Sequence, residues 1–146
     1  MTASENYERI ADAITAETAK KLQNEKELIL TGTGRQMMMM GFNFYEAVNS
    51  EIARKLLICC VEEYLSAINN NEKIRPYLHE YPFTDKNVKI VIYFYNSDGS
   101  DVSSDRISVA AISKGIVTYY VKTSDNQPLK DIHEETYQEA LKLDQK

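Results

Sequence analysis

The sequence predicts a two-layer α+β domain, with two long N-terminal helices, a three-stranded antiparallel β-meander and a short C-terminal helix, in the order α-α-β-β-β-α. Two long segments carry apolar residues at the three- and four-residue spacing of helices, and both precede the clearest strand. Helices grouped before strands favour packing of the helices on one face of an antiparallel sheet. The 146 residues, 43% of them hydrophobic, fit a single globular domain over 1–146.

The first helix is expected to begin at a cap on Thr2 or Ser4 and to end near Gly32. Glu5 and Glu8 place negative charge at the positive end of its dipole. Its apolar stripe consists of Tyr7, Ile10, Ala11, Ile14, Thr18, Leu22 and Ile29. This spacing predicts one long amphipathic helix.

The second helix is expected to begin at Asn43, because Glu46 follows three residues later in the spacing of a capping box. The run Asn69, Asn70 and Asn71 is expected to end it, since Asn tolerates the left-handed cap. Its broad apolar face consists of Ile52, Leu56, Leu57, Cys60, Val61, Tyr64, Leu65 and Ile68. This breadth predicts the central core helix.

The strand signal is strongest in "VKIVIYFY", residues 88–95, which is rich in β-branched and aromatic residues. Alternation places Val88, Ile90, Ile92 and Phe94 on one face, and Val91, Tyr93 and Tyr95 on the other. "RISVAAI" and "IVTYYVK" then flank a short hairpin loop over 113–115. Asp131 and Glu134 repeat the capping-box spacing and predict a short closing helix.

Four consecutive methionines, Met37 to Met40, follow the sequence "TGTGRQ". A Cu(I) site needs converging sulfurs, whereas adjacent residues alternate faces in a strand and fan around a helix. The glycines also lack the spacing and the lysine of a phosphate-binding loop. We therefore expect the methionines to form a buried connector, with a short extra strand as one form of it.

Charge and hydropathy exclude several classes of partner. The net charge is −5 and no cluster of Lys and Arg is present, so the sequence predicts no nucleic-acid partner. No apolar run approaches the roughly 18 residues of a membrane span. As written, the sequence predicts a soluble cytoplasmic chain, or an exported one if a signal peptide was removed upstream; it leaves the localisation unknown.

The sequence carries no complete motif for catalysis or metal binding. "NSDGSD" lacks the glycine and glutamate positions of a calcium loop, and the adjacent Cys59 and Cys60 suit neither a mutual disulfide nor a framework. The two histidines, His79 and His133, lack the spaced partners of a zinc motif. The sequence thus predicts no metal, no cofactor and no catalytic residue, and leans against an enzyme without deciding the matter.

Ten tyrosines are the strongest remaining signal. Tyr93, Tyr95, Tyr119 and Tyr120 are candidate binding residues on a sheet face, with filling of the core margin as the equal alternative. The favoured function is a non-catalytic protein-interaction module that binds a second copy of itself or another protein. The alternative is a small hydrolase or a small-ligand-binding protein that uses His79 or His133.

Two stretches carry a resemblance: "EEYLSAINNNEKIRPYLHEYPFTDKNVKIVIYFYN" and the closing "HEETYQEALKL". With them, about half of the chain resembles a family of small uncharacterised bacterial proteins, some of them exported. The resemblance implies no activity, cofactor or catalytic residue. It implies only an uncharacterised protein of unknown function and raises the expectation of a secretion signal upstream.

Overall fold

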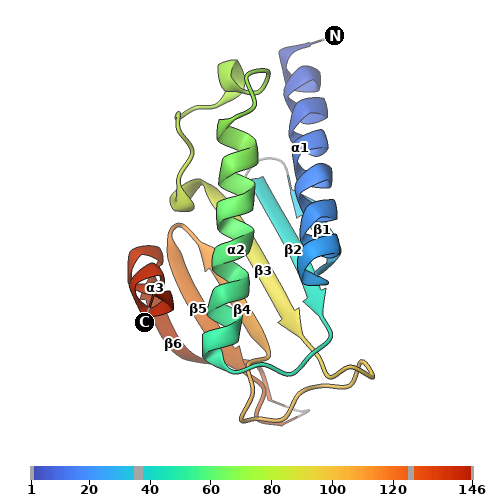
Figure 1. Ribbon diagram of the computed structural model, residues 1–146, viewed down its shortest axis with the longest axis vertical. Helices are drawn as coiled ribbons and strands as arrows, with labels where there is room; N and C mark the ends of the chain where they lie inside the picture. The colour runs from blue at the N-terminus through green and yellow to red at the C-terminus, as the bar shows by residue number, and fades with distance from the viewer. Residues whose placement is uncertain (1, 35–37, 125–126, 146) are drawn as a thin grey trace.

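The computed structural model of the protein describes residues 2–34, 38–124 and 127–145. Its elements run in the order α-β-β-α-β-β-β-β-α (Figure 1). The helices and strands are α1 Ala3–Lys26, β1 Ile29–Gly34, β2 Met38–Phe44, α2 Ser50–Asn69, β3 Val88–Phe94, β4 Val109–Ser113, β5 Ile116–Val121, β6 Lys130–Thr136 and α3 Tyr137–Asp144. Two 3₁₀ turns, Arg75–Tyr77 and Asp85–Asn87, lie in the connector between α2 and β3.

The strands form one six-stranded sheet whose spatial order, β1 to β6, equals their order in the sequence. β2 and β3 are parallel, and every other neighbouring pair is antiparallel. A parallel pair needs a long crossover, which α2 supplies. The predicted fold, with a three-stranded meander as its whole sheet, is therefore wrong: β3, β4 and β5 do form a meander, but β1 and β2 extend it on one side and β6 on the other.

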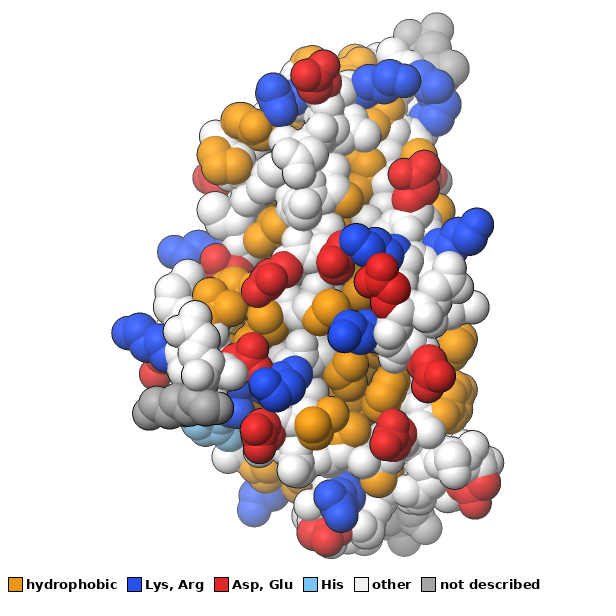
Figure 2. All heavy atoms as spheres, viewed as in Figure 1, with side chains coloured by type: hydrophobic (Ala, Val, Ile, Leu, Met, Phe, Trp, Pro, Cys, Tyr) orange, Lys and Arg blue, Asp and Glu red, His pale blue; other side chains and the backbone are white. Residues whose placement is uncertain are grey.

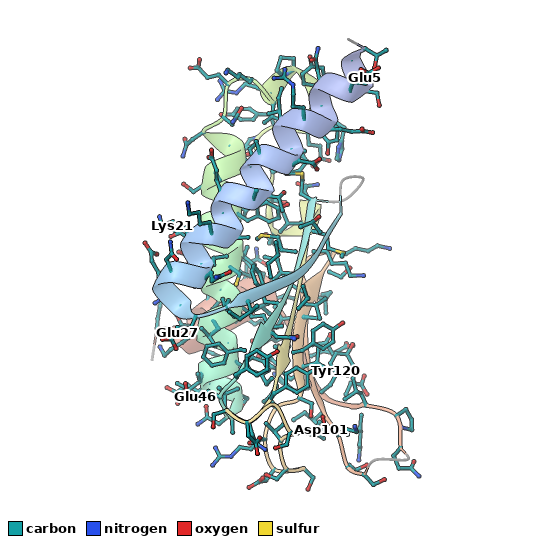
Figure 3. All side chains as sticks on the ribbon, turned by 90° about the vertical axis from the view of Figure 1, so that its right-hand side faces the viewer. Glu5, Lys21, Glu27, Glu46, Asp101 and Tyr120 are labelled. Carbon is teal, nitrogen blue, oxygen red and sulfur yellow. The ribbon has the colours of Figure 1, made fainter. Side chains whose placement is uncertain are left out.

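The helices all lie on one face of the sheet. α1 packs on β1 and β2, α2 on β3 and β4, and α3 on β5 and β6 beside α2. Seen from the side, α1 and α2 stand on one side of the sheet, and Tyr120 lies on the opposite side (Figure 3). We call that opposite side the open face. On strands β2 to β5 it consists of Met39, Gly41, Asn43, Lys89, Val91, Tyr93, Val109, Ala111, Ser113, Ile116, Thr118 and Tyr120.

Local interactions define both ends of α1. The Thr2 side chain accepts a hydrogen bond from the Glu5 amide at 3.1 Å, as expected for the cap of α1. α1 ends at Lys26, because Glu27 takes a left-handed conformation with φ 59°. The expectation of a helix reaching Gly32 is therefore wrong, since residues 29–34 form β1.

The capping boxes predicted for the other helices are misplaced. Asn43 lies within β2, and α2 starts later, at Asn49, whose Oδ1 accepts from the Ile52 amide at 3.0 Å. The box that starts α3 joins Thr136 and Glu139, through hydrogen bonds of 3.1 and 2.9 Å. The first part of the segment assigned to the closing helix, from Asp131, lies instead in edge strand β6, and the short C-terminal helix begins only at Tyr137. Polar residues at capping spacing occur in strands as well, so the spacing alone did not locate these starts.

The core lies between the helices and the sheet. Val88, Ile90, Ile92 and Phe94 are buried and face the helices, as the alternation predicted. Tyr64 of α2 is fully buried, and its hydroxyl lies 2.7 Å from the Thr15 hydroxyl of α1. This bond satisfies both polar groups at the contact between the two helices.

The methionine run forms the start of β2. Met38 and Met40 are buried beneath the helices, while Met39 is half-buried on the open face. Met37 lies outside the described residues. This alternation matches the short extra strand that was one form of the expected connector. Among the described residues, no helix is long and apolar enough to cross a membrane.

Candidate functional site

A row of small side chains crosses the open face at right angles to the strands. The register pairs Gly41 with Val91, Val91 with Ala111 and Ala111 with Thr118, so these four residues are direct neighbours on four successive strands. We call them the small-residue row. Because none carries a side chain longer than valine or threonine, the sheet surface is low along this line.

A second row runs beside the first, two residues further along each strand. It pairs Asn43 with Tyr93, Tyr93 with Val109 and Val109 with Tyr120, and we call it the tyrosine row. The Tyr93 side chain is 39% exposed, whereas Val109 between the two tyrosines is buried. The tyrosine row therefore forms a ridge next to the low line of the small-residue row.

A hollow of about 380 Å³ lies over both rows. Lys89, Ser113 and Ile116 line its far side, and Leu129, from the segment that leads into β6, lines it with the tyrosines. A smaller hollow of about 190 Å³ continues past Tyr93 to Tyr95. Together the two hollows make a shallow, mainly apolar depression on the open face.

The structure separates the four predicted tyrosines. Tyr93 and Tyr120 belong to the tyrosine row, and Tyr95 lines the adjoining hollow and stacks on Tyr45 with ring centroids 5.7 Å apart. Tyr119 points to the opposite face, where it is fully buried. Sequence reasoning missed Tyr45, because β2 was not expected as a full strand.

Two further residues of this surface, Ile116 and Leu129, were also missed; each is at least 40% exposed. The alternation of "IVTYYV" could have placed Ile116 on the same face as Tyr120. No comparable signal pointed to Leu129, since it lies in a loop.

Charge is sparse on the inner strands of the open face and is present at its β6 edge, where Glu134 pairs with Thr118 and Asp131 with Tyr120. Along the fully described strands β2 to β5, Lys89 is the one charged side chain on this side. The helix side is different: Lys, Arg, Asp and Glu side chains are spread over it (Figure 2).

A second cluster lies on the helix side, where α2 meets edge strand β6. Arg54 donates two hydrogen bonds of 2.8 Å to Glu135, and the Tyr119 hydroxyl donates one of 2.9 Å. His133 Nε2 lies 2.9 Å from Glu135 Oε1, and the His133 ring stacks on Tyr119. The Glu135 side chain is only 2% exposed, while that of His133 is 52% exposed. Both carboxylate oxygens are thus already occupied by structural partners.

The pKa values in this cluster follow from burial and hydrogen bonding. Burial alone raises the pKa of Glu135, but the hydrogen bonds from Arg54 and Tyr119 outweigh it, so the pKa lies below its ordinary value. Burial, with the hydrogen bond to Glu135, raises the pKa of Tyr119. Glu135 is therefore held as an anion and Tyr119 as a neutral donor, an arrangement that ties α2 to β6.

The other histidine, His79, lies at the opposite end of the molecule. It lines a hollow of about 360 Å³ with Ser4 and Tyr7 of α1 and with Tyr77 and Phe83. Tyr7 contacts Tyr77 edge to face, with ring centroids 6.4 Å apart, and His79 contacts Phe83 in the same way at 5.6 Å. This hollow has an aromatic lining but is distant in the fold from the Glu135 cluster.

The described residues do not form a cluster of metal ligands. Among residues 2–34, 38–124 and 127–145, no three His, Cys, Asp or Glu side chains are grouped to hold a metal ion. Cys59 is half-buried and Cys60 fully buried, and burial raises the pKa of both thiols. Neither cysteine is thus activated as a nucleophile.

No family model matches the chain, and neither the curated proteins nor the solved structures include a match to it. The resemblance drawn from the sequence therefore stays a prediction.

Proposed function

We propose that the protein is a non-catalytic protein-interaction module and that the open face is its binding surface. The proposal rests on the positions of the exposed large hydrophobic residues on the surface. Nine such side chains occur in the described part of the chain, and five of them lie on or beside the open face: Ile29, Tyr45, Tyr93, Ile116 and Leu129. Scattered apolar residues need no explanation, whereas a group of them on one surface indicates a contact site.

The composition of strands β2 to β5 on the open face suits a protein partner better than a highly charged ligand. Aromatic residues are enriched and charged residues depleted at the centres of protein interfaces. Tyr93 and Tyr120 offer large contact area with few rotatable bonds, and their hydroxyls can bond to a partner's backbone. Lys89 at the margin is placed where interfaces tolerate charge.

The test replaces Tyr93 and Tyr120 with serine, at a protein concentration where the chain sediments as a monomer. If the open face is a docking surface, these side chains are not packed in the monomer, so the melting temperature should change by only about 2 °C. Binding of a hydrophobic dye such as bis-ANS should fall.

The control is Tyr64→Phe, which changes a buried tyrosine and should lower the melting temperature while leaving dye binding at the wild-type level. A large loss of stability in the Tyr93 and Tyr120 variants would show that they belong to the core, and the proposal would fail.

A second candidate function, small-ligand binding, is supported by the hollow beside His79. Three aromatic side chains, Tyr7, Tyr77 and Phe83, could hold a planar ligand there. Histidine ring resonances in an NMR titration with a panel of small aromatic compounds test this candidate. Shifts of His79 without shifts of His133 would support it, and shifts of neither would dismiss it.

A further inference from the structure

We propose that the partner of the open face is an amphipathic α-helix of another protein, which lies along the small-residue row. This helix carries acidic side chains in its first turn and basic side chains in its last. The inference rests on the proposed function and names the partner of the same surface. Three features support it: the width of a trough on the open face, the paired backbone of its floor and the charges around it.

The small-residue row is the floor of a trough that crosses the strands. On one side of it lies the tyrosine row, and on the other a row formed by Met39, Lys89, Ser113 and Ile116. Each bordering row is two residues from the floor along the strands, so the two borders are about 13 Å apart at the usual rise. An α-helix with its side chains is about 10–12 Å across. The trough therefore has the width of one helix.

The backbone of the floor is already engaged in the sheet. Strands β2 to β5 are inner strands, and each is paired with a neighbour on both sides. A partner on this face therefore meets side chains. An extended segment laid across the face would bury backbone N–H and C=O groups without partners, which is costly. A helix pairs these groups within itself, so the face favours a helical partner over an extended one.

The charged side chains around the trough lack partners of their own. Lys89, on the border at β3, is half-buried and makes no hydrogen bond or ion pair with any described residue. Glu134 continues the floor onto β6, and Asp131 continues the tyrosine row. Both are exposed, and both are likewise unpaired within the described part of the chain. A partner that brought an anion to Lys89 and a cation to the β6 edge would complement all three charges.

The positions of these charges also set the direction of the helix. Lys89 and Glu134 are three strand spacings apart, which is about 14 Å along the trough, or about ten residues of helix. A helix that begins near Lys89 can place Asp or Glu there in its first turn, and Lys or Arg over Glu134 in its last turn. The helix dipole favours the same distribution of charge. The opposite direction would require basic residues in the first turn, which the dipole disfavours.

The floor suits the apolar side of such a helix. Side chains at three- and four-residue spacing would point at Val91, Ala111 and Thr118, whose small side chains leave room for groups of the size of leucine. Tyr93 and Tyr120 would flank the helix along one side. The hollow of about 380 Å³ over the two rows is the space that the apolar side chains would occupy.

The experiment measures the binding of two synthetic peptides to the full chain by fluorescence anisotropy. Both peptides have about 14 residues, with leucine at helical spacing among alanines and with blocked ends. One peptide carries two Glu in its first turn and two Lys in its last, and the other exchanges the two pairs. The quantity compared between proteins is the ratio of the two dissociation constants, because this comparison cancels the difference in helicity between the peptides.

The test variant combines Lys89→Glu with Glu134→Lys, which reverses two charges of the trough and leaves the net charge unchanged. Its control combines Glu17→Lys with Lys20→Glu, the same exchange at exposed positions on α1. We expect the wild type to favour the acid-first peptide, the test variant to change the ratio at least about tenfold, and the control to keep it. Ala111→Arg fills the floor and should abolish binding of both peptides, and its melting temperature verifies that it folds.

Three outcomes would overturn the proposal. The first is an equal ratio for the wild type and the test variant, or binding of neither peptide at about 1 mM. The second is a bound peptide whose circular dichroism shows no helix, which would assign the trough to an extended segment. The third is self-association of the wild type that excludes the peptides, which would assign the trough to a second copy. In each case the stability and dye binding of the Tyr93 and Tyr120 variants would decide the proposed function separately.

Discussion

The guanidinium of Arg54 and the carboxylate of Glu135, 81 residues apart in the sequence, meet through two hydrogen bonds of 2.8 Å. Arg54 lies in the first half of α2, and Glu135 in edge strand β6. Planar, paired hydrogen bonds of this kind are the strongest that two side chains form. The pair therefore fixes the last strand of the sheet to the central helix.

Replacing Arg54 with alanine should destabilise the protein by about 3 kcal/mol, because it leaves the buried Glu135 carboxylate without its countercharge. Glu135→Gln should cost less, since the amide oxygen can still accept from Tyr119. Urea denaturation measures both values. A cost below about 1 kcal/mol for Arg54→Ala would show that water replaces the guanidinium without penalty.

Acid should weaken the protein partly through Glu135. Its pKa is lowered in the folded chain, so its contribution is fully present above the ordinary glutamate value of 4.5 and is lost as the pH falls through the lowered value. Other carboxylates titrate in the same range. The Glu135→Gln variant isolates this one, and its stability should fall less steeply with pH below 4.5 than that of the wild type. Parallel curves would contradict the assignment.

The hairpin between β4 and β5 depends on a glycine. Lys114 and Gly115 both have positive φ, 54° and 80°, as a type I′ turn requires. A Cβ on Gly115 would also lie 2.8 Å from Asp85 Oδ2. Gly115→Ala should therefore cost about 2–3 kcal/mol.

Gly99→Ala provides the comparison, because Gly99 has φ 87° but no atom within 4 Å of the added carbon. It should cost about 1 kcal/mol, from backbone strain alone. Thermal unfolding of the two variants measures the difference. If both lose the same stability, the approach of Asp85 to Gly115 has no energetic effect.

Oxidation by dilute peroxide should distinguish neighbouring methionines. Met38 and Met40 face the core at 1% and 0% exposure, whereas Met39 is half-buried on the open face. Peptide mass spectrometry should therefore detect the sulfoxide at Met39 well before it appears at the other two. Equal oxidation rates at all three methionines would mean that local opening of β2 is faster than the oxidation reaction.

Sequence patterns located the elements whose signal is local. The apolar spacing of α1 and α2, and the alternation of β3, were visible because each element buries a regular face. β6 carries no such face: its residues 130–134 are all exposed, so its pattern resembled a polar segment with capping spacing. β1 was missed because "TGTG" places two glycines in a short strand, and glycine is unfavourable in strand interiors.

The candidate site was predictable only in part. Alternation placed Tyr93 outward, but Tyr119 and Tyr120 are adjacent, and the sequence did not show which of them faces the core. The partner of Tyr119 is Glu135, and a buried carboxylate in a charged strand has no local signature. The two rows of the open face depend on register across four strands, which one sequence does not reveal.

The strand order of the sheet has a consequence for how the chain assembles. Every strand pairs with its predecessor in the sequence, so each can be added to a growing edge as synthesis proceeds, and only the β2–β3 step needs a long loop to close. β6 is added last among the strands, and it brings the anion that neutralises Arg54. A nascent chain without β6 would hold that cation without its carboxylate partner beside the core. Docking of the final strand therefore also completes the electrostatics of α2, which is synthesised well before it.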